Sequence, residues 1–258
     1  MHAHLFIPCL VKDCQPEAAY AMVTVLEHLG VEARHPANQT CCGQLAYKAG
    51  DAKNARGLAA RSLDIFSAPG PVVCPSGSCV KMVRSYPELF PSGTPEHAQA
   101  VDLAARTFEF CEFVAALPGA DGLDARLDVR ACYHGSCQMP GQMPGTQQAQ
   151  QVGQPDAPRR LLSAIRGLTL LEAERADRCC GFGGLFSLQF TAVSEALVED
   201  KCREILAQEP EILVSAEPSC LMNISGRLAR LGRPLPALHV AQVLAAALSR
   251  ETPAWRQR

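Results

Sequence analysis

Short runs of apolar and β-branched residues alternate with longer segments of helical periodicity along this 258-residue chain. The runs that predict strands lie at 5–8, 31–36, 70–75, 127–134, 168–174 and 211–217. The segments that predict helices lie at 16–29, 44–66, 78–89, 97–117, 186–207, 219–231 and 239–249. Strands that alternate with helices form parallel sheets with crossover helices, so the pattern predicts an α/β fold.

The pattern occurs twice. Each copy has an apolar run followed by a cysteine, then Cys-Cys-Gly at 41–43 or 179–181, then another apolar run followed by a cysteine. The second copy is longer because it contains a Gln-, Gly- and Pro-rich segment at 138–154, which predicts an inserted loop. An internal duplication is the simplest account. We therefore predict two pseudo-symmetric α/β domains with parallel sheets, at residues 1–118 and 119–258.

Composition and charge exclude several classes of function. The hydrophobic content of 48% and charged content of 19% are typical of a globular protein with a sizeable core. A net charge of −2 and the lack of a basic, aromatic-rich stretch argue against nucleic-acid binding. No apolar run reaches the roughly 18 residues of a membrane span. The N-terminus lacks the basic segment of a signal peptide, so we expect a cytoplasmic location.

Thirteen cysteines are unusual for such a protein. A reducing cytoplasm does not favour a disulfide framework. Neighbouring cysteines are also poor disulfide partners, because adjacent Cα atoms lie about 3.8 Å apart and relaxed disulfides need roughly 4.4–6.8 Å. Clustered thiols therefore indicate a metal centre.

The repeat selects four cysteines in each half as candidate ligands: Cys9, Cys41, Cys42 and Cys79 in the first, and Cys137, Cys179, Cys180 and Cys220 in the second. Four thiolates suit a [4Fe–4S] cluster or a zinc ion. The neighbouring cysteines favour the cluster, since they can bind two different irons. We expect one or two [4Fe–4S] clusters, with zinc as the alternative.

The remaining chemical candidates are weaker. Five cysteines have no counterpart in the other copy and are predicted to be buried thiols that bind nothing: Cys14, Cys74, Cys111, Cys132 and Cys202. His134 lies close to Cys137 in sequence, but no orienting acid is evident, so it is predicted to be a packing residue. No dinucleotide-binding fingerprint is present, and no catalytic residue is assigned.

These motifs resemble the duplicated cysteine-rich (CCG) domain family, over nearly the whole chain. "FIPCLVKDCQPEAA", "QTCCGQLAYKAG", "VVCPSGSCVKMV", "RCCGFGGLFS" and "SAEPSCLMNISGRL" look most like its lactate utilization protein A branch. The resemblance implies an iron–sulfur electron-transfer subunit, not itself catalytic, of a system that oxidises L-lactate to pyruvate. It also implies two partners, a second iron–sulfur protein and a third small subunit.

Two departures from the family pattern bear on the clusters. The heterodisulfide reductase members of the family end each copy in Cys-x-x-Cys, and their five cysteines per site hold a non-cubane cluster. Here Ser76 and Glu217 stand at the earlier of those positions, so four ligands remain and a cubane is expected. The family also tends to have an acidic residue before Ser136 and a histidine after Cys137. We therefore expect the cluster of the second half to be the weaker one.

Two other functions stay open at this point. One is the iron–sulfur subunit of another 2-hydroxy-acid oxidase, such as glycolate oxidase, which usually carries an additional ferredoxin-like module. The other is a non-redox zinc-binding protein. Metal analysis separates the zinc protein from the iron–sulfur proteins.

Overall fold

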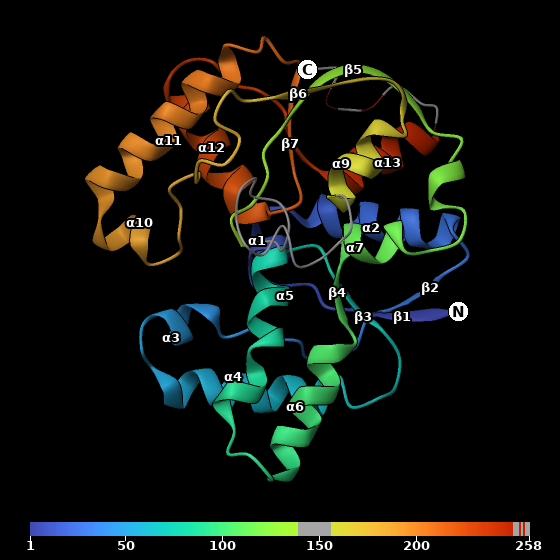
Figure 1. Ribbon diagram of the computed structural model, residues 1–258, viewed down its shortest axis with the longest axis vertical. Helices are drawn as coiled ribbons and strands as arrows, with labels where there is room; N and C mark the ends of the chain where they lie inside the picture. Colours follow the sequence, from blue (N-terminus) through green and yellow to red (C-terminus); the bar gives the residue numbers. More distant parts are fainter. Residues whose placement is uncertain (139–155, 250–252, 254, 256–258) are drawn as a thin grey trace.

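The computed structural model describes residues 1–138 and 156–249 with residues 253 and 255, and contains two four-stranded parallel sheets (Figure 1). The first sheet comprises β1 (His2–Leu5), β2 (Glu32–Arg34), β3 (Val72–Cys74) and β4 (Thr107–Glu109). The second comprises β5 (Arg126–Tyr133), β6 (Arg166–Glu172), β7 (Ile212–Ser215) and β8 (Ala237–His239). Their orders, β2-β1-β3-β4 and β6-β5-β7-β8, are equivalent. The predicted duplicated α/β fold is confirmed.

Helices connect the strands in both halves. The first half contains α1 (Cys9–Cys14), α2 (Pro16–His28), α3 (Gln44–Lys48), α4 (Ala52–Ile65), α5 (Gly77–Arg84), η1 (Tyr86–Leu89), α6 (Pro95–Ala105) and α7 (Phe110–Ala115). It is followed by η2 (Ala120–Gly122), α9 (Ala157–Ser163), α10 (Phe186–Gln189), α11 (Thr191–Leu206), α12 (Pro218–Arg230) and α13 (Val240–Ser249). Within the described residues, no helix combines the length and apolar character that a membrane crossing needs.

Successive side chains of a strand point to opposite faces of its sheet, so they show which core lies on each face. In β3, Val73 packs into a core between the two sheets, whereas Val72 and Cys74 face a second core on the outer side. In β7, Ile212 and Val214 face the central core and Leu213 faces outwards. Helices α2, α7, α9 and α13 contribute to the central core, α4, α5 and α6 cover the outer face of the first sheet, and α11 and α12 that of the second. Because the central core takes residues from both halves, the two repeats form one packed unit.

Several predicted helix boundaries are wrong. The helix predicted at 97–117 is interrupted by β4, a three-residue strand with a buried Thr107. Glu109 then starts α7 as a capping box with Glu112. The helices predicted at 44–66, 78–89 and 186–207 are each divided in two. The sequence pattern does not predict strand β8, and the insertion predicted at 138–154 lies outside the described residues apart from residue 138.

Candidate metal centre

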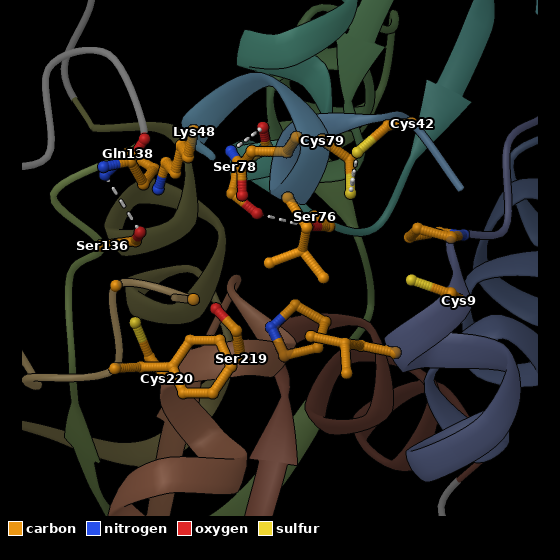
Figure 2. Close-up of a pocket in the computed structure, with 18 of the residues that line it drawn as sticks. Cys9, Cys42, Lys48, Ser76, Ser78, Cys79, Ser136, Gln138, Ser219 and Cys220 are labelled. Atoms are coloured by element: carbon orange, nitrogen blue, oxygen red, sulfur yellow. Dashed lines mark hydrogen bonds between the residues drawn. The ribbon is translucent and has the colours of Figure 1, made fainter. Parts of the chain in front are cut away.

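All eight candidate ligands line a single cavity of about 130 Å³ that lies between the two halves (Figure 2). They are Cys9, Cys41, Cys42, Cys79, Cys137, Cys179, Cys180 and Cys220. Figure 2 shows Cys42 and Cys79 in contact on one side of this cavity and Cys220 on another. The structure therefore brings together residues from most of the length of the chain, from Cys9 to Cys220.

The cysteines of the two halves follow equivalent strands of the two sheets. Cys9 is the first residue of α1, which follows β1, and Cys137 follows β5, the equivalent strand. Cys79 and Cys220 lie in the first turns of α5 and α12, which follow β3 and β7. The carboxyl ends of parallel strands lie at one edge of a sheet, which is where ligands gather in α/β folds. Each vicinal pair lies in the connection after the strand at the sheet edge, β2 or β6.

The sulfur atoms form two sets that correspond to the repeats. In the first thiol set (Cys9, Cys41, Cys42 and Cys79), the Sγ atoms of Cys9 and Cys41 are 3.9 Å apart and those of Cys42 and Cys79 are 3.4 Å apart. In the second thiol set (Cys137, Cys179, Cys180 and Cys220), the Sγ atoms of Cys180 and Cys220 are 3.1 Å apart. Each set therefore contains sulfur atoms in contact, and all four thiols of each set line the same cavity.

Two structural features favour glycine directly after each pair of adjacent cysteines. Gly43 and Gly181 have φ values of +87° and +83°, a region that side chains disfavour. A Cβ at Gly181 would lie 2.7 Å from the carbonyl oxygen of Ser194 in α11, so nothing larger than glycine fits. The same turns direct the N–H groups of Gly43 and Gly181 to the sulfur atoms of Cys41 and Cys179, at 3.4 and 3.3 Å. The Cys-Cys-Gly motif thus supplies two thiols and one hydrogen bond to sulfur.

The second cysteine of each pair is buried, and its backbone is held by a side chain. Cys42 and Cys180 are each 3% exposed. The hydroxyl group of Tyr86 donates to the carbonyl oxygen of Cys42 at 2.9 Å. The amide group of Asn223, in α12, donates to the carbonyl oxygen of Cys180 at 2.8 Å. Both loops are therefore fixed at the point where the thiols enter the cavity.

The crowded thiols compete for ionisation. Hydrogen bonds from Cys42 and Cys9 lower the pKa of Cys41, which favours its thiolate. The hydrogen bond to Cys41, together with burial, raises the pKa of Cys9, and contacts with Cys41 and Cys79 raise the pKa of Cys42. In the second set, the hydrogen bond to Cys179 and burial raise the pKa of Cys137. The metal-free sites therefore hold protons that a bound metal would replace.

Glu217 joins the two helices that carry Cys79 and Cys220. Its buried carboxylate accepts from the Ser78 N–H of α5 at 2.8 Å and from the Ser219 N–H of α12 at 3.4 Å. It also accepts from the hydroxyl groups of Ser76, Ser78 and Ser219, at 3.2, 3.1 and 2.9 Å. A negative charge is favourable at both helix N-termini. Ser76 and Glu217 occupy equivalent positions of the repeat, so residues that correspond in the two halves meet here.

His134 has more contact with the site than the sequence indicated. One of its ring nitrogens and the sulfur atoms of Cys180 and Cys220 all lie within 4.8 Å of one another. His134 is buried, and burial lowers its pKa to about 3, so the ring is neutral. The sequence indicates that His134 is near Cys137, but its distance to Cys180 and Cys220 depends on the tertiary fold.

The five cysteines predicted to bind nothing lie outside the lining of the cavity. Cys111, Cys132 and Cys202 are fully buried in the apolar cores, and Cys14 is exposed. Cys74, also fully buried, lies behind Cys79, and burial raises its pKa. Four of these thiols are buried as predicted, whereas the prediction of a buried thiol is wrong for Cys14. Which thiols bind metal stays a prediction that variants test.

The donor set fits a soft metal centre. Thiolates bind iron–sulfur clusters and zinc, whereas calcium and magnesium require oxygen donors. Four thiols in each set match the number that a four-iron cluster or a structural zinc ion binds. The N–H groups of Gly43 and Gly181 and the N-termini of α5 and α12 would stabilise negative charge on the sulfur atoms.

Comparisons with known proteins agree with this site. The model of a cysteine-rich domain family, CCG, matches residues 3–84 and 131–225. The Lactate utilization protein A of Geobacillus kaustophilus is 40% identical over 245 residues, which cover 95% of this chain and 98% of that protein. The protein of the same name from Bacillus pumilus is 38% identical over 244 residues, covering 95% of this chain and 99% of that protein.

A solved structure supports the fold alone. A hypothetical protein from Helicobacter pylori superposes with a TM-score of 0.64 over 97% of this chain, at 11% sequence identity. The chain spans about half of that protein, 49% of its length.

Proposed function

Because this chain belongs to the CCG family of cysteine-rich domain proteins, we propose that it is an iron–sulfur electron-transfer subunit of a system that oxidises L-lactate to pyruvate. The observation that carries the proposal is the pair of four-thiol sets on one cavity. The names of the similar Geobacillus and Bacillus proteins supply the lactate part of the proposal.

Each thiol set would hold one [4Fe–4S] cluster, through Cys9, Cys41, Cys42 and Cys79 in the first half and Cys137, Cys179, Cys180 and Cys220 in the second. Such clusters, when bound, accept and donate single electrons. The chain's own residues set the position and the charge of the site. Glu217 fixes the helices that carry Cys79 and Cys220, and the N–H groups of Gly43 and Gly181 stabilise the sulfur atoms.

The proposal includes partner proteins. Oxidation of a 2-hydroxy acid needs a hydride or electron acceptor beside a base, and the sequence has no fingerprint of a dinucleotide site. From the similarity to Lactate utilization protein A, we propose that a second iron–sulfur protein and a third small subunit complete the system, and that this chain carries electrons within it.

Metal analysis tests the cofactor. We expect anaerobic reconstitution with iron and sulfide to give a brown protein with about eight irons and about eight sulfides per chain, from two four-iron clusters. If the second site is weaker, the content falls towards half of that value. Stoichiometric zinc with no iron, under the same anaerobic conditions, would contradict the proposal.

A further inference from the structure

One histidine ring nitrogen lies close to the second thiol set. His134 is 4% exposed, and its ring nitrogen lies within 4.8 Å of the sulfur atoms of Cys180 and Cys220. Those two sulfur atoms are themselves 3.1 Å apart. All seven histidines of the chain lie in the described residues, and there His134 alone forms such a group with cysteine sulfurs.

The repeat shows what stands at the same position in the first half. Phe6 directly follows β1 and precedes Cys9 by three residues, and His134 directly follows β5 and precedes Cys137 by three residues. Phe6 is buried in the apolar core, where its ring packs against Phe66 with centroids 5.5 Å apart. An aromatic ring thus fills the position in both halves, but only the ring of His134 has a metal-binding atom.

The backbone holds His134 firmly at the site. Its N–H donates to the carbonyl oxygen of Val214 at 2.8 Å, and its carbonyl oxygen accepts from the Ser215 hydroxyl at 2.8 Å. Val214 and Ser215 belong to β7, the strand that leads to Cys220. The backbone of His134 is therefore held on β7, the strand that leads to the helix that carries Cys220.

We propose that His134 is a nitrogen donor to the metal centre of the second thiol set, which makes the two centres chemically different. The inference rests on the proposed function, since it requires an iron–sulfur centre at Cys180 and Cys220. In this arrangement His134 binds in place of the Cys137 thiolate. A neutral imidazole in place of a thiolate removes one negative charge and raises the reduction potential of a cluster. The second centre then has the higher potential. When one electron passes between the centres, the first is oxidised and the second is reduced.

Pulsed EPR of the reduced, reconstituted chain tests the nitrogen directly. We expect a strongly coupled nitrogen that changes when histidine is supplied as the ¹⁵N form. His134→Phe, which copies the ring found at Phe6, removes this coupling, and His28→Phe, exposed at the end of α2 remote from α1, keeps it. A redox titration of the wild-type chain gives two separate one-electron steps, and these move closer together in His134→Phe.

Substitutions at equivalent cysteines of the two halves give a second test. If His134 supplies a donor, Cys137→Ala loses less of the iron of its centre than the equivalent change Cys9→Ala does, because the imidazole of His134 remains beside Cys180 and Cys220. Iron content and the EPR spectrum distinguish these results. Bound iron without any histidine coupling in the wild-type chain would overturn the inference and leave the proposed function intact. A failure to bind iron at all would instead overturn the proposed function. The isotope experiment needs no variant, so it decides the question even if His134→Phe fails to fold.

Discussion

At the scale of single residues, the sulfur atoms of the two thiol sets lie where free thiols are unfavourable. The Sγ atoms of Cys42 and Cys79 lie 3.4 Å apart in a buried site, and the pKa of Cys42 is raised by its contacts with Cys41 and Cys79. Ionising all four thiols without a metal would place like charges in contact. The Cys202 thiol instead donates to the carbonyl oxygen of Ile224 at 3.7 Å inside an apolar core. This contrast is the basis for predicting that Cys42 is a ligand and that Cys202 is a buried thiol.

Serine substitutions test that separation. We expect Cys42→Ser and Cys180→Ser each to lower iron content to roughly half and to lower thermal stability, because metal binding and folding are coupled. Cys111→Ser and Cys202→Ser are the matched controls, since both thiols are fully buried outside the cavity, and we expect their iron content to stay near that of the wild type. Equal iron loss in all four variants would show that repeat position does not identify the ligands.

At the scale of elements, Glu217 couples α5 to α12. Its carboxylate accepts hydrogen bonds from the first turns of both helices, and each of those turns carries a ligand, Cys79 or Cys220. Removing a partner from buried hydrogen-bonding groups costs about 1–3 kcal/mol, and more for charged groups. The Glu217 carboxylate therefore stabilises the positions of both helix starts, and with them Cys79 and Cys220.

We expect Glu217→Gln to lower the free energy of unfolding by about 1–3 kcal/mol, because the amide nitrogen cannot accept the hydrogen bonds that the carboxylate accepts. Iron retention should fall at both sites. Urea unfolding and iron analysis measure the two effects, with Glu195→Gln, on an exposed position of α11, as the control. Iron loss confined to the second half would mean that Glu217 supports α12 alone.

The sequence predicts most of the strands and helices, including the three-residue strands β2 and β3, and misses β4 and β8. Strand β5 and helices α2, α12 and α13 follow their predicted ranges within two residues, since their apolar patterns extend over many positions. Strands β4 and β8 have three residues each, and their positions depend on pairing with β3 and β7. Pairing partners that are distant in sequence leave no local pattern, so the local periodicity predicts a helix where β4 lies.

The same limit applies to the site. Repetition of Cys-Cys-Gly is enough to select eight cysteines that share one cavity. It cannot reveal that Glu217 accepts hydrogen bonds from Ser76 and Ser78, because those contacts span 139–141 residues and depend on how the tertiary fold places the starts of α5 and α12. Nor can it reveal the position of His134 beside Cys180. Repetition identifies the candidate ligands, and only the fold identifies their neighbours.

At the scale of the whole molecule, the two repeats share one core. The central cluster combines Val25 of α2 with Leu244 of α13, and it reaches β1 and β5 (Figure 1). A boundary near residue 118 stays a prediction, because the structure shows extensive packing across it. The shared core accompanies a shared site, since both thiol sets line one cavity.

The last prediction concerns catalysis by the complete system. Clusters transfer single electrons, whereas oxidation of lactate also needs a base for the hydroxyl proton and an acceptor for the hydride or its electrons. We therefore expect the purified, reconstituted chain alone to show no lactate-dependent reduction of an artificial electron acceptor, and its assembly with the partner subunits to show it. Deletion of the gene should abolish growth on lactate and leave growth on glucose unchanged.

Two results would change this assignment in different ways. Lactate turnover by the purified chain alone would mean that the chain has its own active site, with His134 and Glu217 the first residues to substitute, since both are buried polar groups beside the thiol sets. Normal growth of the deletion strain on lactate, combined with iron bound at both thiol sets, would keep the iron–sulfur subunit and assign it to another 2-hydroxy acid. Growth on glycolate would then be the next measurement, because the same one-electron chemistry of the clusters serves either acid.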